Sequence, residues 1–172
     1  DYKLRWNFAM QRENLSLEKK LLKPYRSFQT NNFVVRKNVF AEFNFNENLN
    51  QYGYEDLLFA MDLKMAKIPI NHIDNPIIND DVETNEVFLG KASESAQSLA
   101  LILKDESNIN KVSELRLAKA YFSLKKNNLN KIYCVLFGVI KPVLARKLKP
   151  GNAHLRWLDL YKLGILCQSM KK

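Results

Sequence analysis

The sequence predicts a mixed α/β piece followed by a basic, mostly α-helical C-terminal region. Its 172 residues, 47% apolar and 26% charged, have the composition of one globular domain that buries a core. Short β-rich runs broken by turn residues occupy the first part of the chain, whereas helical periodicity runs through the second. Charge follows a similar division. Residues 1–103 carry 12 Lys/Arg and 14 Asp/Glu, whereas residues 104–172 carry 15 Lys/Arg and 4 Asp/Glu. The two parts are therefore expected to face different partners.

Loops and short extended pieces are predicted for residues 15–50. Residues 33–36 form a β-rich run that follows the turn-prone residues 30–32. A second short strand is expected over residues 70–73, which lead into a turn at residues 74–76. These strands are the β component of the predicted α/β piece.

Apolar residues at helical spacing predict a helix over residues 55–67, then three consecutive helices over about 86–104, 109–126 and 129–147. A fourth short helix is expected after the Pro-Gly break at residues 150–151. The apolar stripes of these last four helices are Phe88, Ala92, Ala96, Leu99 and Leu103; Val112, Leu115, Ala118 and Phe122; Leu129, Ile132, Leu136, Ile140 and Val143; and Leu155, Leu158, Tyr161 and Ile165. We expect the tail to close on itself through Leu115, Phe122, Leu136 and Ile140.

Membrane-spanning and secreted classes are not indicated by the pattern. The longest apolar run, residues 132–140, has nine residues, whereas a spanning helix needs about 20. The chain does not open on a basic stretch followed by an apolar one, so no signal peptide is expected, and a start without Met suggests a piece of something longer. Cys134 and Cys167 lack paired spacing, which favours reduced thiols in a cytoplasmic protein, and with two His residues a Cys/His zinc site is not expected.

Two adjacent carboxylates, Glu55 and Asp56, stand at the start of the first predicted helix. The free amides and the dipole of a helix start favour negative charge, so an ionised carboxylate there is a usable general base. Acidic residues are also enriched in the first turn of helices for stability alone. From the residues by themselves, both interpretations stay open.

Four short motifs surround these carboxylates: Thr-Asn-Asn-Phe at 30–33, Phe-Asn-Glu at 45–47, Tyr-Gly-Tyr-Glu-Asp-Leu-Leu-Phe at 52–59 and His-Ile-Asp-Asn-Pro-Ile at 72–77. In this order and spacing they resemble the C-terminal half of family 2 glycosyltransferases, most of all the bacterial sugar transferases of surface-polysaccharide synthesis. The resemblance implies a GT-A fold, of which residues 1–92 would be the acceptor-side α/β part. Residues 93–172, where the likeness is weak, would be a helical basic extension.

By this resemblance, Asp56 matches the carboxylate that deprotonates the acceptor hydroxyl in an inverting transfer. Glu55 matches the acidic neighbour that binds or orients the acceptor. Asn31 and Asn32 fall where the family's chain passes beneath the sugar, so their amides could hold sugar hydroxyls, although a plain turn explains them equally well.

Tyr52 and Gly53, in the same motif, are expected to bind substrate. Many relatives place a His after the Asp-Asn-Pro turn to complete a metal site, and this chain has Asn79 there, which is a weaker ligand. The resemblance implies a divalent Mn or Mg ion in the intact enzyme and none in this chain alone. Its partners would be a nucleotide-sugar donor and a polysaccharide or glycolipid acceptor.

A donor site is not expected in this chain, because no Gly-rich phosphate loop and no Asp-X-Asp pair lies upstream of residue 30. A half-domain exposes apolar side chains and strand edges, so we expect the isolated chain to self-associate. Candidate contributors are the strand from Phe33 to Val35 and the face with Phe43 and Phe45.

The basic tail permits further interpretations. Its charge suits the anionic inner face of the cytoplasmic membrane, where the protein would be peripheral, or it is an ordinary solvated surface. Nucleic-acid binding is not favoured, because no recognition motif accompanies the charge. The alternative function is accordingly a non-enzymatic helical interaction or membrane-surface docking module.

Overall fold

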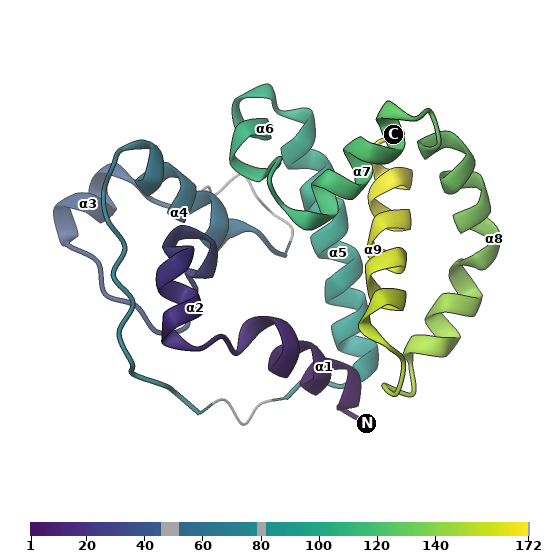
Figure 1. The fold of residues 1–172 in the computed structure, drawn as a ribbon, viewed down its shortest axis with the longest axis horizontal. Helices are drawn as coiled ribbons and strands as arrows, with labels where there is room; N and C mark the ends of the chain where they lie inside the picture. Colours follow the sequence, from purple (N-terminus) through teal and green to yellow (C-terminus); the bar gives the residue numbers. More distant parts are fainter. Residues whose placement is uncertain (46–51, 79–81, 172) are drawn as a thin grey trace.

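The computed structural model describes residues 1–45, 52–78 and 82–171, and it is all-α in these ranges (Figure 1). It is 68% helical, and no strand occurs in the part that is described, so the predicted α/β fold is wrong. The helices are α1 (Lys3–Phe8), a π-helical turn η1 (Ala9–Glu13), α2 (Leu17–Leu22), a 3-10 turn η2 (Pro24–Ser27), α3 (Lys37–Glu42), α4 (Glu55–Met65), α5 (Asn85–Lys104), α6 (Glu106–Val112), α7 (Arg116–Lys126), α8 (Asn130–Leu148) and α9 (Leu155–Ser169).

The two predicted strands are extended segments without a pairing partner among the described residues. A strand needs a neighbour for its backbone N–H and C=O groups, and neither residues 33–36 nor residues 70–73 find one there. Only one side of the first segment is used for packing. The Phe33 ring lies edge-on to Phe28 with centroids 5.4 Å apart, whereas Val34 is fully exposed.

Residues 15–50 were predicted as loops, but the described part contains α2, η2 and α3 (Figure 1). Both α-helices have six residues, too short for an apolar period to stand out in the sequence. Aromatic contacts hold this region on α4, where Phe59 is buried. The rings in this cluster are Phe28, Phe33, Phe40, Phe45 and Phe59.

Helices α5 to α9 pack as a bundle in which α9 contacts α5, α7 and α8 (Figure 1). The predicted helix at 55–67 is confirmed as α4, and the predicted stripes of α5 and α9 are buried, which confirms those two helices. The helix predicted over 109–126 is two helices, α6 and α7, because residues 113–115 turn between them. α5 runs through the boundary predicted between residues 92 and 93.

α8 lies at the predicted place but with the opposite face inward. Its predicted stripe, from Leu129 to Val143, is exposed, and the buried side chains are Cys134, Phe137, Leu144 and Leu148. The expectation that Leu136 and Ile140 close the tail is therefore wrong. Although α8 is apolar on both sides, no single described helix is long and apolar enough to cross a membrane. α7 and α8 together have the required length and apolar composition, but the pair is bent by 117°.

Asn85, a buried polar residue that the periodicity did not single out, ties the start of the chain to the α8–α9 loop. Its Oδ1 accepts the N–H of Leu4 at 2.8 Å, and its Nδ2 donates to the Asp1 carboxylate at 2.7 Å and to the Lys149 carbonyl at 2.8 Å. In that loop Gly151 has φ +77°, and a Cβ there would approach Asn85 Nδ2 to 2.6 Å. The loop therefore needs glycine for both its backbone and its space.

Candidate functional site

The predicted carboxylates, Glu55 and Asp56, line a cleft of about 850 Å³ between the N-terminal segments and the α5–α9 bundle. One wall comes from η1 and the segment after η2, and another from α5 and α9, while the start of α4 lies between them. Aromatic rings line the cleft together with both acidic and basic side chains. The aromatic members are Phe8, Phe28, Phe45, Tyr52, Tyr54 and Phe88.

Two consecutive left-handed residues set the start of α4. Gly53 has φ +105° and Tyr54 has φ 78°, and a Cβ on Gly53 would come within 3.1 Å of the Ser95 side chain. Glu55 closes this turn, because its Oε1 accepts the N–H of Gly53 at 3.0 Å. Glu55 thus has a structural role in the turn while it also lines the cleft.

Among the described residues, Thr30, which lies 26 positions earlier in the chain, donates both hydrogen bonds that Asp56 accepts. The Thr30 hydroxyl donates to Asp56 Oδ1 at 2.8 Å, and its backbone N–H donates to Oδ2 at 3.1 Å. Both carboxylate oxygens are therefore oriented by hydrogen bonds. Thr30 was in the predicted motif, but its role was missed because the motif gave no sign that its hydroxyl meets Asp56.

The remaining predicted binding residues lie in different places. Tyr52 and Gly53 line the cleft, and the Lys91 ammonium sits 5.1 Å from the centroid of the Tyr52 ring. Burial raises the pKa of the Tyr52 hydroxyl, and Lys91 opposes this shift. Asn31 and Asn32 are exposed and are not among the residues that line the cleft; the Asn32 side chain instead donates to a backbone carbonyl, that of Asn75, at 3.0 Å.

A basic wall from η1 and α9, which the sequence did not predict, faces into the same cleft. Arg12 is paired bidentately with Asp159, at 2.6 and 2.8 Å. Next to this pair, the Lys162 ammonium donates a long hydrogen bond, of 3.5 Å, to the Ser95 hydroxyl. It is the one hydrogen bond that the Lys162 side chain makes with the described residues. Burial lowers the pKa of Lys162 to about 8, with Arg12 lowering it further and Asp159 and Glu13 acting in the opposite direction.

We expect Lys162→Met to stabilise the protein at pH 7 by about 1–3 kcal/mol, because each unit of pKa depression costs the charged form about 1.4 kcal/mol. The folded-state pKa is about 8 against 10.5 for a free lysine, so unfolding takes up a proton between these two values. The free energy of unfolding of the wild type therefore rises with pH across that window. The advantage of Lys162→Met should be full below pH 8 and vanish near pH 10.5, as measured by urea unfolding at a series of pH values.

Lys162→Arg is the control for this pH dependence, because arginine stays protonated throughout the same window. We expect no gain in stability at pH 7 for this variant. Equal stability of wild type and Lys162→Met at pH 7 would show that enclosure does not penalise the ammonium group.

Among the described residues, no cluster of three or more His, Cys, Asp or Glu side chains is placed to hold a metal ion. Asn79, the predicted ligand, lies outside the described residues. His72 has a structural contact instead, since its Nε2 lies 2.9 Å from the carbonyl oxygen of Pro24.

The cleft brings an oriented carboxylate, an enclosed amine and aromatic walls together from segments far apart in the sequence. Comparisons with family models, curated proteins and solved structures find no match for this chain. Its function is accordingly inferred from the geometry of the cleft and from the motifs that supply Asp56 and Thr30.

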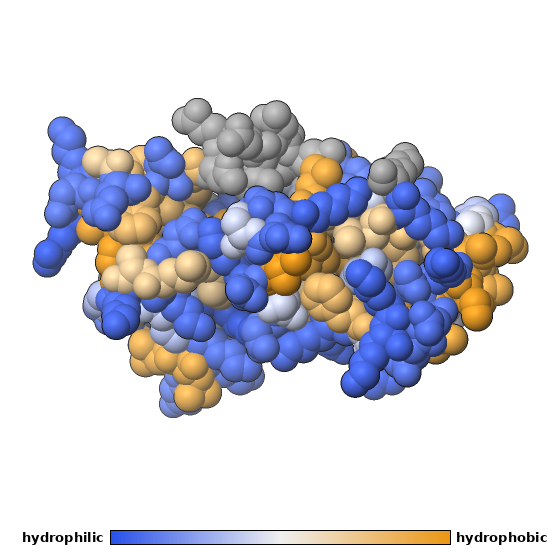
Figure 2. Space-filling view, turned by 90° about the horizontal axis from the view of Figure 1, so that it is seen from above, coloured by the Kyte–Doolittle hydropathy of each residue, from blue (hydrophilic) through white to orange (hydrophobic). Residues whose placement is uncertain are grey.

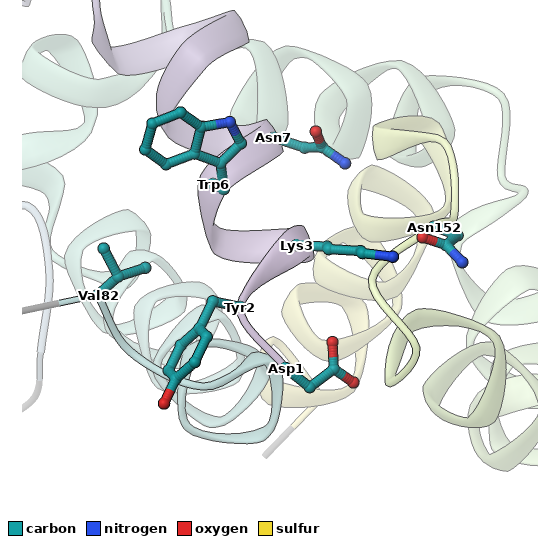
Figure 3. Close-up of a pocket in the computed structure, with 7 residues that line it drawn as sticks. All are labelled: Asp1, Tyr2, Lys3, Trp6, Asn7, Val82 and Asn152. Atoms are coloured by element: carbon teal, nitrogen blue, oxygen red, sulfur yellow. The ribbon is translucent and has the colours of Figure 1, made fainter.

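A second depression, of about 990 Å³, lies at the start of the chain (Figure 3). It is lined by the N-terminal residues, including Tyr2 and Trp6, together with Val82 and Asn152. Lys3 extends toward Asn152 in this view. None of the predicted site residues that the structure describes lines it, and it shares no lining residue with the candidate cleft.

Proposed function

We propose that this chain provides the acceptor-binding part of a glycosyltransferase, with Asp56 as the general base. In the proposed step, Asp56 removes the proton of an acceptor hydroxyl while the hydroxyl oxygen bonds to the anomeric carbon of a nucleotide-activated sugar. The bond from that carbon to the nucleoside diphosphate breaks, and the diphosphate leaves with the electron pair. Attack opposite the leaving group inverts the anomeric configuration.

The observation that carries this proposal is the pair of hydrogen bonds from Thr30 to Asp56. A general base must be held within reach of the proton that it removes, and it must be ionised before it acts. Two donors from one residue fix both oxygens of Asp56 at the edge of the cleft. A carboxylate that served only to stabilise the start of α4 would need neither contact with Thr30.

The composition of the cleft supports a saccharide as the ligand. Its volume, about 850 Å³, is within the range of small-molecule sites, about 300–1,000 Å³. Aromatic rings such as Phe28 and Tyr52 offer flat apolar surfaces for the C–H face of a sugar ring. Glu55 and Lys91 offer polar contacts for its hydroxyl groups.

The test is an assay on the full-length product of the gene with UDP- and GDP-sugars and a mixture of bacterial surface oligosaccharides. Mass spectrometry follows the gain of one sugar by an acceptor, and a coupled assay follows release of nucleoside diphosphate. We expect release that depends on the acceptor. Release that is identical with and without every acceptor, or transfer that is unaffected when Asp56 is replaced, would refute the proposal.

A further inference from the structure

An apolar ridge runs along the outer face of α8. Every exposed residue from position 132 to 143 is apolar or glycine: Ile132, Val135, Leu136, Gly138, Val139, Ile140, Pro142 and Val143. Val135, Val139 and Val143 are 66, 73 and 66% exposed, which is unusual for three valines in one ordered helix. At 1.5 Å per residue, this ridge is roughly 18 Å long.

The ridge is separate from the core of the bundle. Phe137 and Leu144 point to the opposite side of α8, where they are buried with α9 residues. In Figure 2, hydrophobic residues gather at the right-hand end of the molecule, where α8 lies in Figure 1. The apolar outer face is therefore not required to hold the bundle together, and its exposure has a cost in solubility.

The chain segment that carries the ridge contains basic residues and no acidic ones. Residues 115–158 contain ten Lys/Arg and no Asp or Glu. Lys131 is exposed near one end of the ridge, and Arg146 and Lys147 are exposed at the other. Lys147 is held there by the Trp157 ring, whose centroid is 3.8 Å from the ammonium nitrogen.

We propose that the outer face of α8 docks on an anionic lipid surface, with the ridge entering the headgroup region and the flanking Lys and Arg contacting lipid phosphates. An apolar face bordered by basic residues is the pattern of helices that lie in the plane of a membrane interface. Each basic residue near an anionic surface contributes to the attraction. This inference stands on α8 and its surroundings and does not depend on sugar transfer.

Charge decides against a second copy of the chain as the occupant. Two copies that met through α8 would bring their basic segments together without acidic residues from the same segments to offset them. An anionic lipid surface offsets that charge and receives the apolar side chains at once. The same reasoning predicts that binding weakens as salt screens the charges, because the Debye length is about 8 Å at physiological ionic strength.

The experiment measures sedimentation of the protein with vesicles of phosphatidylcholine, alone or with about one third phosphatidylglycerol. We expect at least about tenfold tighter binding to the anionic vesicles, lost between about 0.05 and 0.5 M salt. The double substitution Val135→Ser and Val139→Ser removes the centre of the ridge, and we expect it to weaken binding by about tenfold or more.

Val34→Ser with Met65→Ser is the matched control, because these side chains are 100 and 70% exposed and lie outside α8. We expect this variant to bind like the wild type, and circular dichroism checks that both double variants keep their helices. The triple substitution of Lys131, Arg146 and Lys147 by Gln should remove the preference for anionic vesicles.

Three results would overturn the proposal. The first is equal binding to anionic and neutral vesicles by the wild type. The second is an equal loss of binding in the ridge variant and in its control. The third is a dimer that the ridge variant abolishes, without vesicle binding, which would make a second copy the occupant.

Discussion

Asp56→Asn is expected to lower kcat by about 10²–10⁴-fold while the KM for the nucleotide sugar changes little. Asparagine keeps the size of the side chain, and its Oδ1 still accepts the Thr30 hydroxyl contact seen at 2.8 Å. What is lost is the ability to take a proton from the acceptor hydroxyl, together with the Oδ2 that accepts the Thr30 N–H at 3.1 Å. Steady-state kinetics with the full-length gene product separate this effect on turnover from any effect on donor binding.

Asp62→Asn is the matched control, since it makes the same substitution on the same helix. Asp62 pairs with Lys111 at 2.5 Å and does not line the cleft. We expect turnover close to that of the wild type. If Asp56→Asn and Asp62→Asn have the same kcat at saturating substrate, Asp56 is not the base.

Thr30→Val tests the positioning of the base separately from the base itself. Valine has the shape of threonine and retains the backbone N–H that contacts Asp56 Oδ2, but it lacks the hydroxyl. We expect a smaller loss of kcat, about tenfold, because the carboxylate is misaligned and not removed. A loss as large as that of Asp56→Asn would mean that Thr30 itself contacts the reacting groups.

The sequence predicted both ends of α5 and of α8 to within one residue, because each helix repeats its apolar residues at helical spacing. It could not predict which side of α8 is buried. Both the stripe through Ile132, Leu136 and Ile140 and the one through Cys134 and Phe137 have helical spacing. Periodicity identifies an apolar face, but a face that packs in a core and a face that docks on a partner have the same pattern.

The prediction of two strands is wrong for a related reason. A β-rich run such as residues 33–36 forms a strand only beside a partner, and its partner is not encoded in the run itself. For the site, the chain-local motif predicted the two carboxylates at the start of α4. The contacts of Asp56 with Thr30 and of Arg12 with Asp159 join residues 26 and 147 positions apart, so they required the folded structure.

Gly164→Ala is expected to destabilise the protein by about 2 kcal/mol and to lower Tm by about 4–8 °C. In α9, Gly164 faces the Phe137 ring of α8, and an added Cβ would overlap that ring. Phe137 has no exposed surface, and it lies between Tyr133 and Tyr161, with ring centroids 6.4 and 5.9 Å away. The ring cannot move aside without displacing its neighbours, so the α8–α9 contact must open.

Gly90→Ala gives the opposite expected sign and serves as the control. Gly90 is also within a helix, α5, but it is exposed and a Cβ there would meet no atom within 4 Å. Since alanine is the better helix former, we expect a gain of up to about 1 kcal/mol at this position. Alanine would bring the same gain at Gly164. The overlap with Phe137 therefore costs more than the net loss of stability that calorimetry measures. Two variants of equal stability would mean that α8 and α9 are not packed through this glycine.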